Sequence, residues 1–130
     1  MKNERIWITV GKRSDLVPGS GVGARLGDRQ IALFWIPELD DSLLGKSPPK
    51  MSLFAVSNYC PFSGVHIIAR GIVGDIKGEP VVASPLYKQH FSLVDGRCIE
   101  QPEVSLDTWG VRLQGNALQV REKTAEATAA

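Results

Sequence analysis

The chain has 130 residues, which is enough for one domain that buries about two-thirds of the surface its unfolded chain exposes. Its 15 basic and 14 acidic residues give a net charge of +1 and form no long basic run, so neither nucleic acid nor an anionic membrane is expected as the main partner. No segment approaches the roughly 20 apolar residues of a membrane-spanning helix. The N-terminal residues lack the apolar stretch of a secretion signal. We therefore expect a soluble, cytoplasmic protein.

Short apolar runs separated by glycine and proline predict an all-β chain. Three turn sequences, Gly27-Asp28, Lys77-Gly78-Glu79 and Gln114-Gly115-Asn116, each separate two such runs, which favours three β-hairpins. In chain order, strands are expected at residues 6–10, 22–26, 30–36, 53–58, 72–76, 80–83, 88–93, 109–113 and 117–120. Strands at this spacing predict an antiparallel sandwich or a small barrel.

Two segments fall outside this pattern. Residues 37–50 carry three prolines and are expected to form a long loop between strands, which we interpret as a tolerated insertion. Residues 122–130 have almost nothing to bury and are expected to form a flexible C-terminal tail. The sequence therefore predicts one domain over residues 1–121, followed by that tail.

The two cysteines, Cys60 and Cys98, are expected to be free thiols, since disulfides are rare in the cytosol. Together with His66 and His90 they match the ligand count of a Cys₂His₂ zinc site. Ligands of such sites come in close pairs along the chain, and these four residues are spaced too widely. Each histidine is therefore interpreted as an ordinary strand or surface residue.

Two loop segments carry the most informative pattern. Cys60-Pro61-Phe62-Ser63-Gly64 and Ser84-Pro85-Leu86-Tyr87 resemble the two cluster-binding loops of a Rieske iron–sulfur domain. A Rieske [2Fe-2S] centre takes a Cys and a His from each loop, so that two thiolates hold one iron and two imidazoles hold the other. Here the four ligand positions hold Cys60, Phe62, Ser84 and Tyr87. Phenylalanine has no donor atom, and a neutral hydroxyl is a poor ligand for a soft cluster.

These four residues are therefore interpreted as vestigial ligand positions, and no metal or cofactor is expected in this chain. The chain also lacks a glycine-rich dinucleotide fingerprint that opens a helix, and it lacks a G-x-S-x-G nucleophile elbow. A small β domain without ligands cannot hold a redox cofactor for a multi-electron reaction. Any redox catalysis would therefore need another chain.

A longer resemblance specifies the family. Residues 70–75 (RGIVGD) and 79–93 (EPVVASPLYKQHFSL), followed by residues 95–98 and 102–106, are similar to the small subunit of cytoplasmic NAD(P)H-dependent nitrite reductase. The resemblance extends over residues 7–120. It implies an all-β, Rieske-like antiparallel sandwich with a subdomain formed by the two loops, and without the full ligand set. Cys60 is a departure, since many members carry Asp at that position.

The family resemblance also implies a function. The chain would be the non-catalytic small subunit of an assimilatory enzyme that reduces nitrite to ammonia, inactive in isolation. Its partner would be a large subunit that carries FAD, an iron–sulfur cluster and sirohaem. Two alternatives remain open. One is a Rieske-type [2Fe-2S] ferredoxin, against which the missing histidines count; the other is a free-standing β interaction module.

Two roles are open for the aromatic residues of the loops. Phe62, Leu86 and Tyr87 are expected to pack the two loops together where a cluster would lie. Alternatively, Phe62 or Tyr87 points outward as a docking anchor, since aromatic residues are enriched at binding hot spots. The candidates for docking the partner mix aromatic and polar side chains at the tip of the loops; they are Phe62, Ser63, Tyr87, Lys88, Gln89 and His90.

Overall fold

The computed structural model of the chain describes residues 6–37, 52–86 and 88–122. Residues 38–50 of the predicted loop, residues 123–130 of the predicted tail and Tyr87 lie outside the described residues. The strands are β1 (Ile8–Lys12), β2 (Gly21–Leu26), β3 (Arg29–Trp35), β4 (Leu53–Ser57), β5 (Tyr59–Cys60), β6 (Val65–His66), β7 (Ile72–Ile76), β8 (Glu79–Ala83), β9 (His90–Ser92), β10 (Thr108–Gln114) and β11 (Ala117–Glu122). Two short 3₁₀ helices, η1 (Arg13–Asp15) and η4 (Ile68–Arg70), interrupt them. The all-β prediction is confirmed.

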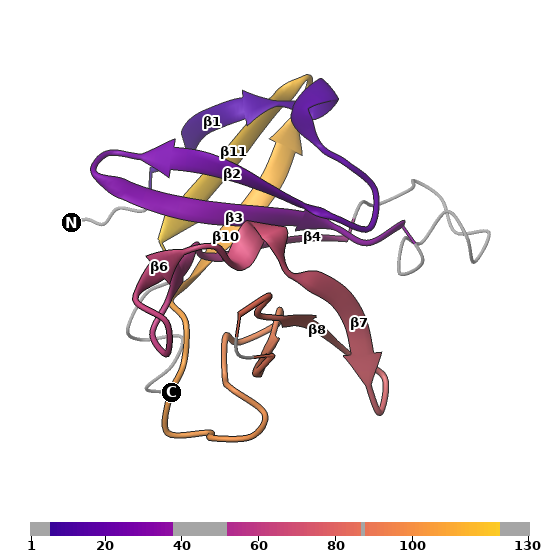
Figure 1. The fold of residues 1–130 in the computed structure, drawn as a ribbon. Helices are drawn as coiled ribbons and strands as arrows, with labels where there is room; N and C mark the ends of the chain where they lie inside the picture. Colours follow the sequence, from indigo (N-terminus) through magenta and orange to yellow (C-terminus); the bar gives the residue numbers. More distant parts are fainter. Residues whose placement is uncertain (1–5, 38–51, 87, 123–130) are drawn as a thin grey trace, which may run out of the picture.

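The strands form three antiparallel sheets. The largest has six strands in the order β1-β11-β10-β4-β3-β2, and the other two have the orders β7-β8-β9 and β5-β6. In Figure 1 the six-stranded sheet occupies the upper part of the molecule, and the β7–β8 hairpin extends below it. The small sheets therefore form a subdomain on one side of the large one.

The three predicted hairpins are present at the predicted turns. Gly27-Asp28 joins β2 to β3, Lys77-Gly78 joins β7 to β8, and Gly115-Asn116 joins β10 to β11. Lys77 and Gly78 have φ angles of 52° and 87°, which is the left-handed pair that a two-residue type I′ turn requires. This turn fixes the register of β7 on β8, and β7 covers the predicted residues 72–76 without an offset.

Strand β3 is buried on both faces and divides the core into two layers. Successive side chains of a strand point to opposite faces, and Ile31, Ala32, Leu33 and Phe34 are all buried. Ile31 and Leu33 pack in one layer with Leu16, Ala55, Trp109, Leu118 and Val120. Ala32 and Phe34 pack in the other layer with Ile36, Val56, Cys60, Ile68, Val82, Phe91, Leu93, Cys98 and Leu106. The second layer joins the large sheet to the small ones and lies beneath the two loops.

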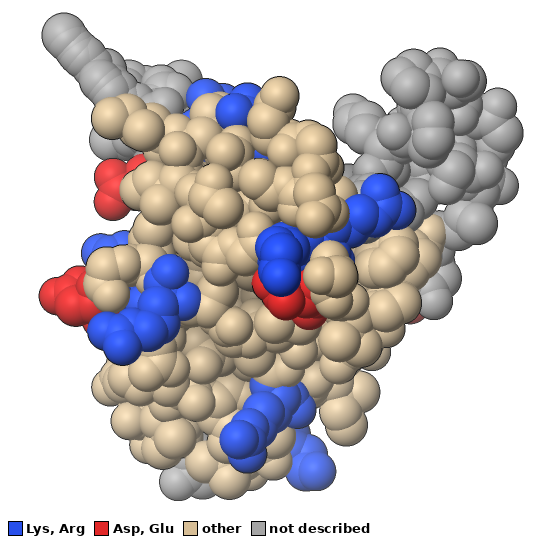
Figure 2. All heavy atoms as spheres, turned by 90° about the horizontal axis from the view of Figure 1, so that it is seen from above, with Lys and Arg blue, Asp and Glu red and all other residues tan. Residues whose placement is uncertain are grey.

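The charged surface is divided into small groups. Figure 2 shows Lys and Arg side chains in separate clusters, with uncharged surface between them on the face that it displays. One group is ordered by stacking: the guanidinium carbons of Arg112 and Arg121 lie 4.3 and 4.5 Å from the ring centroid of Trp7, a cation–π geometry. Among the described residues, no helix has the length and apolar character that crossing a membrane demands.

Candidate functional site

The first loop is a small hairpin formed by β5 and β6. Its turn is closed by the Gly64 N–H, which donates to the Cys60 carbonyl at 2.8 Å. Gly64 has a φ of 74°, a conformation that glycine adopts without steric cost. At the base of the hairpin the rings of Tyr59 and His66 meet edge to face, with centroids 5.3 Å apart. The loop is therefore ordered by its own contacts.

Asn58 ties the start of this loop to the rest of the fold. Its side-chain Oδ1 accepts a hydrogen bond from the Ala69 N–H at 2.7 Å. Its carbonyl accepts from the N–H groups of Ile67 and Ile68 at 2.8 and 3.1 Å, and its own N–H donates to the Gln30 carbonyl at 3.0 Å. A buried amide with its partners in place holds backbone rigidly. Sequence reasoning treated Asn58 only as the last residue of a strand.

The second loop is closed by its own backbone. The Ser84 N–H donates to the Gln89 carbonyl at 2.9 Å, and the Lys88 N–H donates to the Ser84 carbonyl at 3.0 Å. Ser84 is buried and faces the first loop, where its Oγ lies 3.7 Å from the Sγ of Cys60. The two predicted loops therefore come together at Cys60 and Ser84.

The residues at the ligand positions do not fit a [2Fe-2S] cluster. The sulfur of Cys60 and the hydroxyl of Ser84 contact each other, and Cys60 is 0% exposed. The Phe62 ring packs against the buried ring of Phe91, with centroids 6.0 Å apart and planes tilted by 42°. Tyr87, at the fourth position, lies outside the described residues. Since two irons need four strong ligands, one thiol, one hydroxyl and a hydrocarbon ring cannot replace them.

The two cysteines are free and buried, but their thiols have different surroundings. Burial raises the pKa of Cys60, but hydrogen bonds from the hydroxyl and N–H of Ser63, and from Ser84, outweigh it and leave the pKa below its ordinary value. Burial also raises the pKa of Cys98. There it outweighs the backbone hydrogen bonds to the thiol, so the pKa lies above its ordinary value. Hydrogen bonds to a thiolate favour the charged form, so the first loop retains an environment suited to a thiolate.

Glu100 is a site residue that the sequence did not single out. Its Oε1 accepts from the His90 N–H at 2.9 Å, and its Oε2 lies 2.6 Å from His90 Nδ1. Burial raises the pKa of Glu100, but the hydrogen bonds from His90 outweigh it and hold the pKa below its ordinary value. Nothing in the local pattern connects two residues ten positions apart in sequence. Within the described part of the chain, no three potential metal ligands gather into a site.

The predicted docking residues divide into two groups. Phe62, Lys88 and Gln89 line one cavity of about 370 Å³, together with Glu100 and Gln101. The remaining described candidates are engaged locally, because the Ser63 hydroxyl accepts from the Val65 N–H at 3.4 Å and His90 contacts the Glu100 carboxylate. Leu86, which was expected to help pack the loops together, is 50% exposed.

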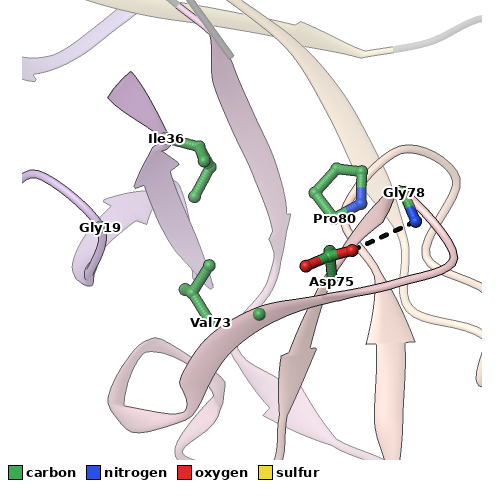
Figure 3. Close-up of a pocket in the computed structure, with 7 residues that line it drawn as sticks. Gly19, Ile36, Val73, Asp75, Gly78 and Pro80 are labelled. Atoms are coloured by element: carbon green, nitrogen blue, oxygen red, sulfur yellow. Dashed lines mark hydrogen bonds between the residues drawn. The ribbon is translucent and has the colours of Figure 1, made fainter. Parts of the chain in front are cut away.

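A second cavity, of about 440 Å³, lies between the end of β3 and the β7–β8 hairpin. Figure 3 shows Ile36 and Val73 on one side of it, and Pro80 across from them, near Asp75 and Gly78. The charged group among its described lining residues is Asp75, whose Oδ2 accepts from the Gly78 N–H at 3.1 Å (Figure 3). This carboxylate closes the hairpin turn, so the cavity presents mainly hydrocarbon.

The fold and the paired loops define a Rieske-like domain, and comparison with known proteins agrees. The family model described as a Rieske-like [2Fe-2S] domain matches residues 6–121. A more distant likeness is to the ferredoxin of carbazole 1,9a-dioxygenase from Nocardioides aromaticivorans, with a TM-score of 0.67, 15% identity, and coverage of 90% of this chain and 98% of that one. At that identity the likeness establishes the fold alone.

Relatives of higher sequence identity show which family of Rieske-like domains the chain belongs to. The small subunit of nitrite reductase (NADH) from Escherichia coli is 36% identical over 115 residues, covering 88% of this chain and 96% of that protein. The NMR structure of the Escherichia coli protein NirD has a TM-score of 0.76 and 34% identity, covering 93% of this chain and 100% of that one. Part of the nitrite reductase [NAD(P)H] large subunit of Klebsiella oxytoca is 34% identical, covering 89% of this chain but 11% of that protein. The chain belongs to the family of nitrite reductase small subunits, as its sequence predicted.

Proposed function

We propose that this chain is the non-catalytic small subunit of a cytoplasmic, assimilatory NAD(P)H nitrite reductase that converts nitrite to ammonia. It would act beside a large subunit that carries FAD, an iron–sulfur cluster and sirohaem. The observation that carries the proposal is the 36% identity to a nitrite reductase (NADH) small subunit over nearly the whole of both chains. The Klebsiella oxytoca large subunit adds support, since a segment of that protein resembles this entire domain.

The site supports a companion role. The three described ligand positions hold a buried thiol, a buried hydroxyl and a ring packed on Phe91, so this chain offers no ligand set for a redox centre of its own. We infer that the isolated chain turns over no nitrite. Electron transfer would take place in the large subunit, and the Rieske-type ferredoxin alternative would lack its cofactor.

The same two loops would form the docking surface. Their tip combines the Phe62 ring, the Gln89 amide and the exposed charge of Lys88, a mixture common at protein interfaces. Leu86 adds an apolar side chain that is 50% exposed. Half-buried Phe62 would connect this surface to the core, because its ring packs on Phe91.

The proposed function is tested by purification and activity measurements. The chain is co-expressed with the large subunit, and nitrite-dependent oxidation of NADH and NADPH is measured for the complex and for each subunit. We expect co-purification, turnover by the complex and none by the isolated chain. An anaerobic preparation of the isolated chain is expected to be colourless, without stoichiometric iron or sulfide. Stoichiometric sulfide in that preparation would favour a ferredoxin and contradict the proposal.

The docking surface is tested with two matched charge insertions. Leu86→Glu places a carboxylate at the tip, and Val17→Glu places one on a residue of almost equal exposure, 49%, outside the two loops. We expect Leu86→Glu to weaken capture of the large subunit and Val17→Glu to leave it unchanged. Equal capture by both variants would move the interface away from the tip.

A further inference from the structure

The cavity between the two loops combines groups of different chemistry. Phe62 comes from the first loop, Lys88 and Gln89 from the second, and Glu100 and Gln101 from the segment that follows Cys98. A lining that combines an aromatic ring with a carboxylate, two amides and a lysine is typical of a site that orients a polar guest. The cavity, about 370 Å³ in volume, has room for one side chain of a partner.

Gln89 carries an acceptor without a donor. Its Oε1 is shielded from water, and no described residue donates a hydrogen bond to it. Such an acceptor destabilises a folded protein, and it calls for a missing partner. Gln89 lines the cavity, and rotation of its side-chain amide would bring this oxygen to an N–H group of a bound guest, which would supply the donor that the described residues do not.

The backbone beside Gln89 is held in an unfavourable conformation. Lys88 has a φ of 64°, in the left-handed region that residues with a Cβ rarely adopt. Two backbone hydrogen bonds of the second loop, from Ser84 to Gln89 and from Lys88 to Ser84, enforce it. Strained backbone of this kind persists where the surrounding structure over-determines it, which is common at binding sites.

The Glu100 carboxylate is fixed in place and ionised at neutral pH. His90 orients both of its oxygens, at 2.9 Å from the backbone N–H and 2.6 Å from Nδ1, and the Cys98 thiol adds a contact of 3.7 Å to Oε1. The side chain remains 46% exposed. Two carboxylate oxygens have about four lone-pair positions, so a guest can still donate to this group.

We propose that the cavity receives an arginine side chain of the large subunit, an inference that rests on the proposed function. A guanidinium is planar and presents five N–H donors. It can therefore donate to the Glu100 carboxylate and to the Gln89 amide oxygen while its face lies on the Phe62 ring. An acidic guest would instead meet the Glu100 charge. Among the described lining residues, Lys88 is the one whose charge opposes a cation, and its exposed side chain can turn into solvent.

Affinity for the large subunit tests the charge pattern. Glu100→Gln and Gln89→Met are each expected to weaken binding about tenfold, which corresponds to about 1.4 kcal/mol. Lys88→Met is expected to strengthen binding about two- to threefold, because it removes a like charge at an exposed position. Glu103→Gln, an exposed carboxylate on the same segment, is the control and is expected to change nothing. Weaker binding by Lys88→Met together with stronger binding by Glu100→Gln would identify an acidic guest and overturn the proposal.

Stability separates a binding role from a structural one. Because Gln89→Met removes an acceptor that lacks a donor, its melting temperature is expected to equal or exceed that of the parent chain, even though its binding is weaker. A fall in both melting temperature and binding would mean that Gln89 supports the loop, and would overturn the proposal.

A titration without the partner tests the cavity alone. The isolated chain is titrated with N-acetyl-arginine amide and with N-acetyl-norleucine amide, while NMR follows the Gln89 side-chain amide and the Glu100 backbone amide. We expect saturable shifts with the arginine probe, reduced in Glu100→Gln, and none with norleucine. Equal responses to both probes, or none to either, overturn the proposal. If the unmodified chain does not bind the large subunit, the proposed function fails, and this titration still decides whether the cavity takes a guanidinium.

Discussion

Replacing Phe62 with alanine tests whether hydrocarbon contact holds the two loops where a cluster would lie in a Rieske protein. Truncating a fully buried phenylalanine costs about 3 to 5 kcal/mol. The Phe62 side chain is partly rather than fully buried, so we expect a cost below this range, about 2 kcal/mol. Losing the ring pair with Phe91 adds about 0.5 to 1 kcal/mol. We therefore expect Phe62→Ala to lower the free energy of unfolding by about 2 to 3 kcal/mol.

For a domain of this size, 1 kcal/mol corresponds to about 4 °C in melting temperature, so the variant should melt about 10 °C lower. Thermal unfolding followed by circular dichroism, and urea unfolding followed by tryptophan fluorescence, measure this directly. Leu86→Ala is the control, because its side chain is 50% exposed and its loss should cost less than about 1 kcal/mol. If Phe62→Ala melted within 2 °C or so of this control, the packing argument would fail. Phe62 would then be a docking anchor, and capture of the large subunit should be lost.

Four further substitutions test other contacts of the fold. Gly71→Ala adds a Cβ that overlaps the backbone carbonyl at the end of β8, so we expect a loss of about 1 to 3 kcal/mol in urea unfolding. Gly74→Ala meets nothing within 4 Å and should be neutral or slightly stabilising; equal effects of the two would refute the close contact. Asn58→Ala leaves the part-buried N–H of Ala69 without its acceptor and should cost about 1 to 3 kcal/mol, while a neutral result would mean that water replaces the side chain. Because folding lowers the Glu100 pKa from 4.5, its carboxylate stabilises the fold above pH 4.5 and this contribution is lost as the pH falls. The free energies of unfolding of the parent chain and of Glu100→Gln should therefore converge as the pH falls. A difference that stays constant with pH would contradict the lowered pKa.

The hairpins could be predicted from sequence because their information is local. Lys77-Gly78 supplies the two positive φ angles of a tight turn, and the flanking strands follow from it by register. The strand expected at residues 30–36 likewise coincides closely with β3 (Arg29–Trp35). Strands β5 and β6 were not predicted, since two residues each are too few to show any alternation.

The contacts that shape the site could not be predicted because they join segments that are distant in sequence. Glu100 meets His90 across ten residues, and Asn58 meets Ala69 across eleven. The sequence identified Cys60 and Ser84 as facing positions only through the family resemblance, and the 3.7 Å contact between them depends on how the second core layer joins the sheets. The expected role of Leu86 depended on the direction of one side chain, which composition does not determine.

The two loops keep a Rieske-like arrangement without a cluster, and the strength of each remaining contact shows which ones hold them. A cluster would join both loops through four metal–ligand bonds, whereas the contact between Cys60 and Ser84 is one weak hydrogen bond to sulfur. Side-chain contact at that point is therefore too weak to position the loops. The packing of Phe62 on Phe91, the backbone bonds within each loop and the amide of Asn58 do so instead, and these links need no cluster. The tip is then released from the demands of metal ligation, so its side chains are available for recognition of a partner.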